Sequence, residues 1–331
     1  MAGRERCGMR VLVGTVGQSV LATDDGEHWG RLGPTNGFHS DAIVRTLVNA
    51  PDAPNVIWAG TDQGILRSDD GGRSWSRLEG PLARQQVWRI SLHPSQSDVL
   101  FVGTGTPSPA RMFRSEDRGA TWKQLDVEIA EECPAVGVPR VTDIAIDPVE
   151  PTRVWASIEV DGMRQSTDGG QSWRRIAGPI TNPDGHAASV SPGPPKAVVL
   201  TVNNEIFISY DDGTSWEPVG VQQRFPYTHV RDVVFDATDP RTAWAAIGDA
   251  TPGTTGALMR TRDSGRSWER VDLPVAPNSA MWVIRTQPDA PNLLFAASRY
   301  GYLYRSDDRG ASWIKLPREF SEVTSIVWVP D

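Results

Sequence analysis

The octet SDDGGRSW at residues 68–75 decides the fold of this 331-residue chain, because close copies of it recur along the whole sequence. The copies are ATDDGEHW (22–29), SEDRGATW (115–122), STDGGQSW (166–173), SYDDGTSW (209–216), TRDSGRSW (261–268) and SDDRGASW (306–313). Their terminal tryptophans lie 43 to 52 residues apart. Modules of this length, marked by Trp, Gly and Asp, are typical of the four-stranded blades of a β-propeller.

The rest of each module has the pattern of an antiparallel meander. A first apolar run such as 141–146 leads into a turn rich in Pro and Asp, such as DPVEPT at 147–152. A second run such as RVWASI (153–158) follows, and a third enters the octet, whose tryptophan begins the fourth strand. Short β-rich runs separated by turn residues predict hairpins, and no helical periodicity of useful length competes with them.

The two chain ends are predicted to complete one blade together. The N-terminal segment supplies three strands, and the tail EVTSIVWVP (322–330) matches the first strand of the other modules. Pairing them removes the free sheet edges. We therefore predict an all-β chain, a single seven-bladed β-propeller over 1–331 with a composite first blade closed by the C-terminal strand. Its blades are predicted at 9–32 with 322–330, 43–78, 86–126, 140–176, 186–219, 229–271 and 280–316.

The octet residues themselves have a structural explanation. Each aspartate can accept hydrogen bonds from turn amides, each following glycine permits a positive φ, and each tryptophan can bury roughly 200 Å² between neighbouring sheets. A ligand or metal site in every blade is the alternative, and a stapled hairpin is the simpler explanation. The aspartates concerned are Asp24, Asp70, Asp117, Asp168, Asp211, Asp263 and Asp308.

The octet resembles the Asp-box (BNR) repeat, and the resemblance covers nearly the whole chain. It implies a β-propeller with its boxes at the blade periphery, away from the active face. Members of this family include sialidases, xyloglucanases, sortilin-like receptors and a photosystem II assembly factor, so the resemblance does not imply one activity.

Each of these members differs from the present sequence in at least one feature. Sialidases carry an Arg-Ile-Pro segment, whereas the nearest string here is Arg-Ile-Ala at 175–177. Xyloglucanases look like two propellers in tandem, and this chain has room for one. Sortilin-like receptors have a larger ring, a secretory signal and a membrane anchor, and the photosystem factor is exported; none of these signals is recognisable in the sequence.

The composition of the chain limits the classes of binding partner and the cellular compartment that we expect. The chain has 33 Lys and Arg against 41 Asp and Glu, a net charge of −8, which argues against nucleic acid as a partner. The sequence contains no run of 18 apolar residues, so no membrane span is predicted. The two cysteines, Cys7 and Cys133, fit a reducing compartment, and no apolar stretch follows the basic N-terminus. We therefore expect a cytoplasmic protein.

A functional face is predicted opposite the boxes. In a propeller, the loops from fourth to first strands and from second to third strands share one face around the axis. Aligning the first strands by the turn that follows them gives one equivalent position per blade at the mouth of the central channel. Two blades have the apolar residues Ile43 and Ala280 at this position, and the other five have a polar residue. These polar residues are Gln86, Arg140, His186, His229 and Glu322.

Of these five, His186, His229, Arg140 and Glu322 are the candidate catalytic residues. The two histidines come from adjacent blades, so they can hold a divalent metal in the central channel together with a carboxylate or amide. Without metal they can act as general acid and base. The alternative is that both are solvated or bonded to a neighbouring blade.

The same face carries candidate ligand-binding residues. Acidic residues there can form a glycosidase pair or be solvated, and arginines can bind a carboxylate or phosphate, or pair with Asp143 and Asp232 between blades. Tryptophans near the axis can stack on a sugar or pack in the core. The candidates are Gln86, Trp88, Arg224, Tyr227, Arg231, Trp282, Tyr300, Glu159 and Asp161. The longer loops of the middle and later blades predict an off-centre pocket under blades four to six.

Two classes of function remain open at this point. The mixed set of His, Arg, Glu and aromatic residues favours a polar ligand pocket, in a hydrolase or lyase acting on a glycan or small molecule. The alternative is a non-catalytic scaffold that binds a protein partner through the same face.

Overall fold

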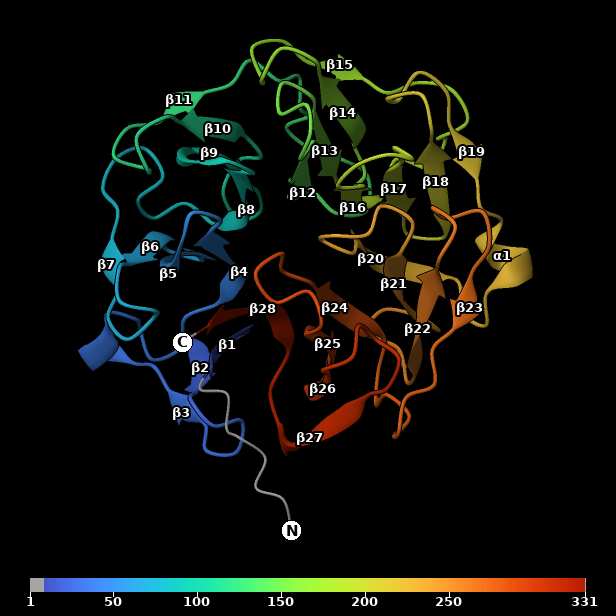
Figure 1. The fold of residues 1–331 in the computed structure, drawn as a ribbon. Coiled ribbons are helices and arrows are strands. Elements are labelled where there is room, and N and C mark those ends of the chain that lie inside the picture. Colours follow the sequence, from blue (N-terminus) through green and yellow to red (C-terminus); the bar gives the residue numbers. More distant parts are fainter. Residues whose placement is uncertain (1–8, 331) are drawn as a thin grey trace.

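The computed structural model describes residues 9–330, and it forms seven four-stranded antiparallel sheets arranged as blades around one axis (Figure 1). This confirms the predicted seven-bladed propeller and its closure by the C-terminal strand. Two short helical turns interrupt the strands, η1 (Pro34–Asn36) and α1 (Val221–Arg224). No helix in this part of the chain has the length and apolar character needed to cross a membrane. Cys7 lies outside the described residues.

The first four blades are built as follows, each from its inner to its outer strand. Blade 1 contains β28 (Val323–Pro330), β1 (Met9–Thr15), β2 (Val20–Thr23) and β3 (Gly30–Arg31). Blade 2 contains β4 (Val44–Ala50), β5 (Ala53–Thr61), β6 (Gly64–Ser68) and β7 (Ser76–Arg77). Blade 3 contains β8 (Val87–His93), β9 (Gln96–Thr104), β10 (Met112–Ser115) and β11 (Lys123–Gln124). Blade 4 contains β12 (Val141–Ile146), β13 (Val154–Ile158), β14 (Gly162–Ser166) and β15 (Arg174–Arg175).

The other three blades follow the same order. Blade 5 contains β16 (Gly185–Val190), β17 (Val198–Val202), β18 (Glu205–Ser209) and β19 (Glu217–Pro218). Blade 6 contains β20 (His229–Phe235), β21 (Ala243–Gly248), β22 (Gly256–Thr261) and β23 (Glu269–Arg270). Blade 7 contains β24 (Met281–Arg285), β25 (Leu294–Ser298), β26 (Tyr302–Ser306) and β27 (Ile314–Glu319).

The C-terminal strand β28 is the innermost strand of blade 1. It pairs antiparallel with β1 from Met9 opposite Pro330 to Thr15 opposite Val323. Trp328 at its centre is completely buried and packs against Phe295 of blade 7, with ring centres 5.3 Å apart. The tail therefore belongs to the core as well as to the ring closure.

The hydrophobic core lies between neighbouring blades. Alternate strand residues point to the two faces of each sheet, and both faces are covered by the adjacent sheets, so the strands are apolar along most of their length. Trp58, Trp155 and Trp244 occupy equivalent positions in second strands and are completely buried. Each such ring stabilises one contact between blades, by a few kcal/mol.

Each Asp box closes the hairpin between the third and fourth strands, and blade 4 shows the arrangement. Asp168 accepts hydrogen bonds from the backbone N–H groups of Gln171 and Ser172 and from the hydroxyls of Ser166 and Ser172. The Ser172 hydroxyl contributes most to lowering the pKa of Asp168 to about 2. The carboxylate thus replaces solvent as the acceptor for the turn amides.

The first box departs from the predicted assignment by one residue. Asp25, and not Asp24, accepts the backbone N–H groups of Glu27 and His28 and the Thr23 hydroxyl. His28 stands where the other boxes have Ser or Thr, and its Nδ1 lies 2.7 Å from the Asp25 carboxylate. Asp24 instead pairs with Arg10 at 2.8 Å. The prediction for Asp24 was wrong because the first turn takes Thr23 in place of Ala22 as its first hydroxyl.

The first strand of every blade carries a β-bulge near its start. In β8, Val87 is opposite Thr104 and Arg89 is opposite Gly103, so Trp88 is the extra residue. A bulged residue leaves the alternation of the strand and aims its side chain elsewhere, here toward the axis. The seven bulged residues in chain order are Arg45, Trp88, Thr142, His186, Arg231, Trp282 and Thr324.

Candidate functional site

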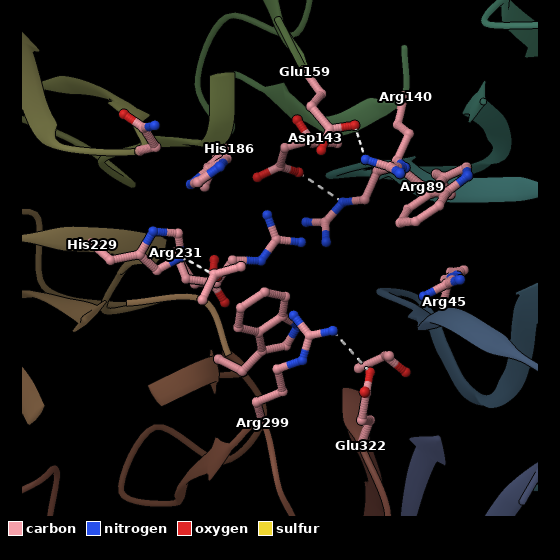
Figure 2. A pocket seen from close by; sticks show the side chains of 18 of the residues that line it. Arg45, Arg89, Arg140, Asp143, Glu159, His186, His229, Arg231, Arg299 and Glu322 are labelled. Atoms are coloured by element: carbon pink, nitrogen blue, oxygen red, sulfur yellow. Dashed lines mark hydrogen bonds and ion pairs between the residues drawn. The ribbon is translucent and has the colours of Figure 1, made fainter. Parts of the chain in front are cut away.

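A cavity of about 570 Å³ lies on the propeller axis, and side chains from all seven blades line it (Figure 2). It is formed by the beginnings of the first strands and by the loops between second and third strands. The strand order places these segments on the face opposite the boxes. The cavity is central, so the predicted off-centre position under blades four to six was wrong. Every blade contributes its bulged residue, whatever the length of its loops.

The seven bulged residues all line this cavity and form a ring, one residue per blade. The predicted ring was the position two residues earlier, which holds Gln86, Arg140, His229 and Glu322. His186 does not belong to that set, because it is itself a bulged residue, and Asp184 is the blade 5 equivalent. The register of blade 5 was shifted by two because its turn, SPGPPK at 191–196, contains three prolines, and Pro194 aligns with the other turns as readily as Pro192.

Three members of the ring are tied to the next blade. The Thr142 hydroxyl donates to the carbonyl of Gly185 at 2.8 Å, and Thr324 donates to that of Val44. His186 Nδ1 lies 2.6 Å from the carbonyl oxygen of Val230, so this nitrogen carries the proton. These bonds link adjacent first strands around the axis. The arginines and tryptophans of the ring are longer, and they extend into the cavity.

Four of the five carboxylates that line the cavity are held by arginines. Asp143 pairs with Arg89 at 2.7 Å, and Asp232 pairs with Arg285 at 2.5 Å; both pairs connect neighbouring blades. The other two pairs lie nearer the mouth. They are Arg140 with Glu159, and Arg299 with Glu322 at 3.2 Å.

Two arginines in the cavity, Arg45 and Arg231, have no such partner. Neither makes a hydrogen bond or an ion pair within residues 9–330, and the Nε of Arg45 is buried without an acceptor. Burial lowers the pKa of both guanidinium groups, that of Arg45 to about 10 with a further contribution from the neighbouring Arg140. Figure 2 shows the two side chains entering from opposite sides of the view.

Each unpaired arginine lies against a tryptophan of the ring. The Arg45 guanidinium is 4.1 Å from the centre of the Trp88 ring, and Arg231 is 4.4 Å from that of Trp282. A guanidinium that stacks on a ring keeps its N–H groups free at its edge. The cavity therefore contains two guanidinium groups whose N–H donors have no acceptor among the described residues.

The two histidines lie side by side, with ring centres 5.3 Å apart. His229 Nε2 is 2.8 Å from the Thr251 hydroxyl, and His186 Nε2 is 3.6 Å from the Asp184 carboxylate. Burial, with the positive charge of Arg231 and the proximity of His186, lowers the pKa of His229 to about 4. His229 is therefore neutral near pH 7 and able to accept a proton.

The geometry of these histidines bears on the predicted metal site. No group of three or more His, Cys, Asp or Glu side chains in the described part of the chain is arranged to hold a metal ion. His186 also uses its Nδ1 in the bond to the neighbouring blade. We therefore assign no step to a metal.

The structure separates the predicted site residues into two groups. Those that line the cavity are His186, His229, Arg140, Glu322, Trp88, Arg231, Trp282 and Glu159. The cavity lining does not include the other five, Gln86, Arg224, Tyr227, Tyr300 and Asp161.

The residues outside the cavity have evident structural surroundings. Gln86 is buried, and Asp161 is buried in an ion pair with Arg164 at 2.8 Å. Tyr227 packs on the core between blades 5 and 6. Arg224 belongs to α1, at the outer edge of the disc in Figure 1. Tyr300 is exposed on the loop face, beside Arg299.

Sequence reasoning missed Arg45 and Arg285 as cavity residues. The signal for Arg45 was present, because it stands two residues after Ile43 just as Trp88 stands two after Gln86. The bulge itself leaves no mark in the sequence, so the register that turns Arg45 inward was not recognised. Arg285 is identified only by its partner across the blade boundary, Asp232.

Comparison with known proteins places the chain among propellers. The family model for sortilin (neurotensin receptor 3) matches residues 204–329, and that for the BNR-Asp box repeat matches residues 112–125. A xyloglucanase of Hypocrea jecorina (strain QM6a) is 22% identical over 86% of this chain. The chain spans 39% of that relative's length.

Solved structures agree on the fold. The GH74 xyloglucanase from Xanthomonas campestris superposes with a TM-score of 0.64 and 19% identity, over 82% of this chain and 45% of that one. YCF48 bound to D1 peptide superposes with a TM-score of 0.52 and 18% identity, over 83% of this chain and 84% of that one. In its repeated boxes and its seven closed blades, the chain is similar to the Asp-box (BNR) repeat β-propellers.

Proposed function

We propose that the axial cavity binds an anionic small molecule or the acidic end of a glycan. The observation that carries this proposal is the pair Arg45 and Arg231, two half-buried cations that face a cavity and have no acceptor in the described chain. A buried charge without a partner is costly, and a carboxylate or phosphate can accept two parallel N–H bonds from each guanidinium. A cavity of about 570 Å³ has the size of a small-ligand site.

The same contacts argue against hydrolysis of a neutral sugar chain by a carboxylate pair. That reaction needs two acids free to act as proton donor and as base or nucleophile. Here Glu159 and Glu322 are held by arginines, as are Asp143 and Asp232 deeper in the cavity. Positive groups surround the space that a neutral substrate would occupy, which favours an anion.

The cavity also offers acid–base chemistry to a bound anion. His229 is neutral above about pH 4 and is oriented by Thr251, so it can remove a proton from a ligand. His186, whose Nε2 lies 3.6 Å from the Asp184 carboxylate, is the second imidazole at this place in the cavity. We therefore propose hydrolase or lyase chemistry on the anion as the activity of this cavity, in line with the prediction from sequence.

Calorimetric titration tests the binding proposal. We expect the protein to bind glucuronate, acetate or inorganic phosphate, and glucose far more weakly, at constant ionic strength. Arg231→Gln should weaken anion binding about tenfold or more, because each charged hydrogen-bonded pair contributes about 1.5–3 kcal/mol.

The matched control is Arg262→Gln, an exposed arginine of the sixth box. It removes the same charge on the opposite face, and it should bind anions like the original protein. Equal binding by the two variants, or equal affinity for glucose and glucuronate, contradicts the proposal.

A protein-binding role for the same face has one observation in its favour. Tyr300 is 43% exposed, a large aromatic side chain on the loop face, in the loop that also contains Arg299 of the cavity lining. Exposed aromatic residues are frequent anchors of protein interfaces. A partner held at this loop would bind independently of Arg45, so capture of a partner by an Arg45→Gln variant separates this role from ligand binding.

A further inference from the structure

The arginine–tryptophan contacts of the cavity occur twice. Around the axis, the bulged residues read Thr324, Arg45, Trp88 in blades 1 to 3, and Thr142, His186, Arg231, Trp282 in blades 4 to 7. Apart from His186, the second series repeats the first. In both, an arginine is followed in the next blade by the tryptophan on which it stacks.

Each tryptophan has a second arginine close to it. Arg140 lies 4.9 Å from the centre of the Trp88 ring, and Arg299 lies 4.5 Å from that of Trp282. These second arginines are the ones held by glutamates, Arg140 by Glu159 and Arg299 by Glu322. We call the sets Arg45–Trp88–Arg140 and Arg231–Trp282–Arg299 the first and second cationic clusters.

Each cationic cluster thus contains one neutralised and one unneutralised guanidinium. Arg45 comes from blade 2 and Arg231 from blade 6, and Figure 2 shows them reaching in from opposite sides of the view. A single carboxylate or phosphate seated on one cluster would leave the arginine of the other without an acceptor. Two anionic groups, one at each end of a ligand, satisfy both.

We propose that the ligand of this cavity is a two-ended dianion, such as a dicarboxylate or a bisphosphate, with one anionic group at each cationic cluster. This inference rests on the proposed binding of an anion and adds the number and placement of its charges. The end of the ligand at the second cluster would lie beside His229, whose ring centre is 6.3 Å from that of Trp282.

Titration of a homologous series tests the inference. The probes are the dicarboxylates from succinate to pimelate and the monocarboxylates from butyrate to heptanoate, with fructose 1,6-bisphosphate and fructose 6-phosphate as a second pair, all at one ionic strength. We expect one dianion length to bind at least about tenfold more tightly than its singly charged counterpart, because the second group binds at high effective concentration.

Variants of each cluster identify the two ends. Arg45→Gln and Arg231→Gln should each reduce the best dianion to the affinity of its monoanion, and Arg45→Lys should retain part of the difference because it keeps the charge. Circular dichroism and thermal melting show whether each variant is folded, and Arg262→Gln should keep the full preference.

The outcomes distinguish this inference from the proposed function. Monoanions that bind as tightly as dianions of every length overturn the two-ended ligand and leave anion binding intact. If neither kind of anion binds, anion binding itself is wrong. A dianion preference that survives in Arg45→Gln also overturns the inference, because the first cluster would then not hold either end.

Discussion

The two faces of the propeller use repetition in opposite ways. On the box face, the same hydrogen bonds recur from blade to blade: Asp70, Asp168 and Asp211 each accept two serine hydroxyls and backbone N–H groups of their own turns. On the cavity face, one equivalent position per blade holds arginine twice, tryptophan twice, threonine twice and histidine once.

This difference separates stability from function. A turn that recurs with the same bonds in most blades contributes a similar small stabilisation in each, so no single one of these boxes is special. A position whose backbone is fixed by a bulge, and whose side chain varies from blade to blade, builds an asymmetric cavity on a symmetric frame. Substitutions on the two faces should therefore affect different measurements.

Deletion of β28, the strand that closes the ring, should have the largest effect on stability. Deletion of residues 322–331 removes β28, including the buried side chains of Ile326, Val327, Trp328 and Val329. Each fully buried side chain of this kind contributes about 1.5–3 kcal/mol, and their sum approaches the whole stability of a domain. We expect the truncated chain to lose its cooperative melting transition.

Thermal melting followed by circular dichroism checks this expectation. Removal of the N-terminal residues 1–8, which precede β1, is the control and should leave the transition in place. A truncated chain that melts like the original would show that blade 1 closes without its innermost strand.

The next largest effects are expected for substitutions in a box, which should reduce stability and leave anion affinity unchanged. Trp216→Ala in the fifth box empties a site that is 6% exposed and should cost about 3–5 kcal/mol, whereas Asp211→Ala should cost about 1 kcal/mol through the lost turn bonds. Neither should change anion affinity by more than about twofold. Denaturant unfolding and titration on the same samples measure both quantities.

Arg45→Gln is the reciprocal variant. It should weaken anion binding at little cost in stability, because it removes a buried charge that has no partner. A strong loss of stability in Arg45→Gln, or a strong loss of affinity in Asp211→Ala, would remove the distinction between the faces.

Much of the box face could be predicted from sequence, and much of the cavity could not. The octets predicted the number of blades and the hairpin at each box, because every copy carries its own turn chemistry within eight residues. The cavity depends on a one-residue bulge and on pairs across blade boundaries, such as Arg89 with Asp143. The pairs were anticipated only as an alternative to ligand binding. The bulge was not recognised, so Arg45 was missed, and the extra prolines of the blade 5 turn led to the wrong register for His186.

The two faces should also lose their contributions to stability in different pH ranges. The folded pKa of His229 is about 4 against 6.5 for the free side chain, so between these values the unfolded chain binds a proton that the folded chain does not. Stability should therefore fall by about 1–3 kcal/mol as pH decreases from 6.5 to 4. The box carboxylates are different. Asp168 and Asp211, with pKa values of about 2, protonate first in the unfolded chain, and their stabilisation is lost as pH falls from about 4 to 2.

Denaturant unfolding from pH 2 to 8 measures both windows. His229→Gln should flatten the curve above pH 4 and leave the acid limb unchanged, whereas Asp211→Asn should reduce only the acid limb. His39→Gln, at an exposed histidine, serves as the control for the upper window. An unchanged slope between pH 4 and 6.5 in His229→Gln would contradict the buried neutral histidine on which the proposed chemistry depends.

The smallest effects are expected at two residues that were first predicted to bind ligand and that lie outside the cavity lining. Arg224 reaches the carbonyl of Arg266 at 3.5 Å on the outer edge of the disc, and Tyr300 is exposed in the loop that also contains Arg299 of the cavity lining. Arg224→Gln and Tyr300→Ala should therefore change stability by less than about 0.5 kcal/mol and leave the affinity for small anions unchanged. Titration and melting of both variants check this. A partner protein on the loop face would contact the exposed Tyr300 before the cavity. Loss of partner capture in Tyr300→Ala with unchanged anion affinity would therefore assign the loop face and the cavity to two different ligands. A loss of anion affinity would instead extend the binding site beyond the ring of bulged residues.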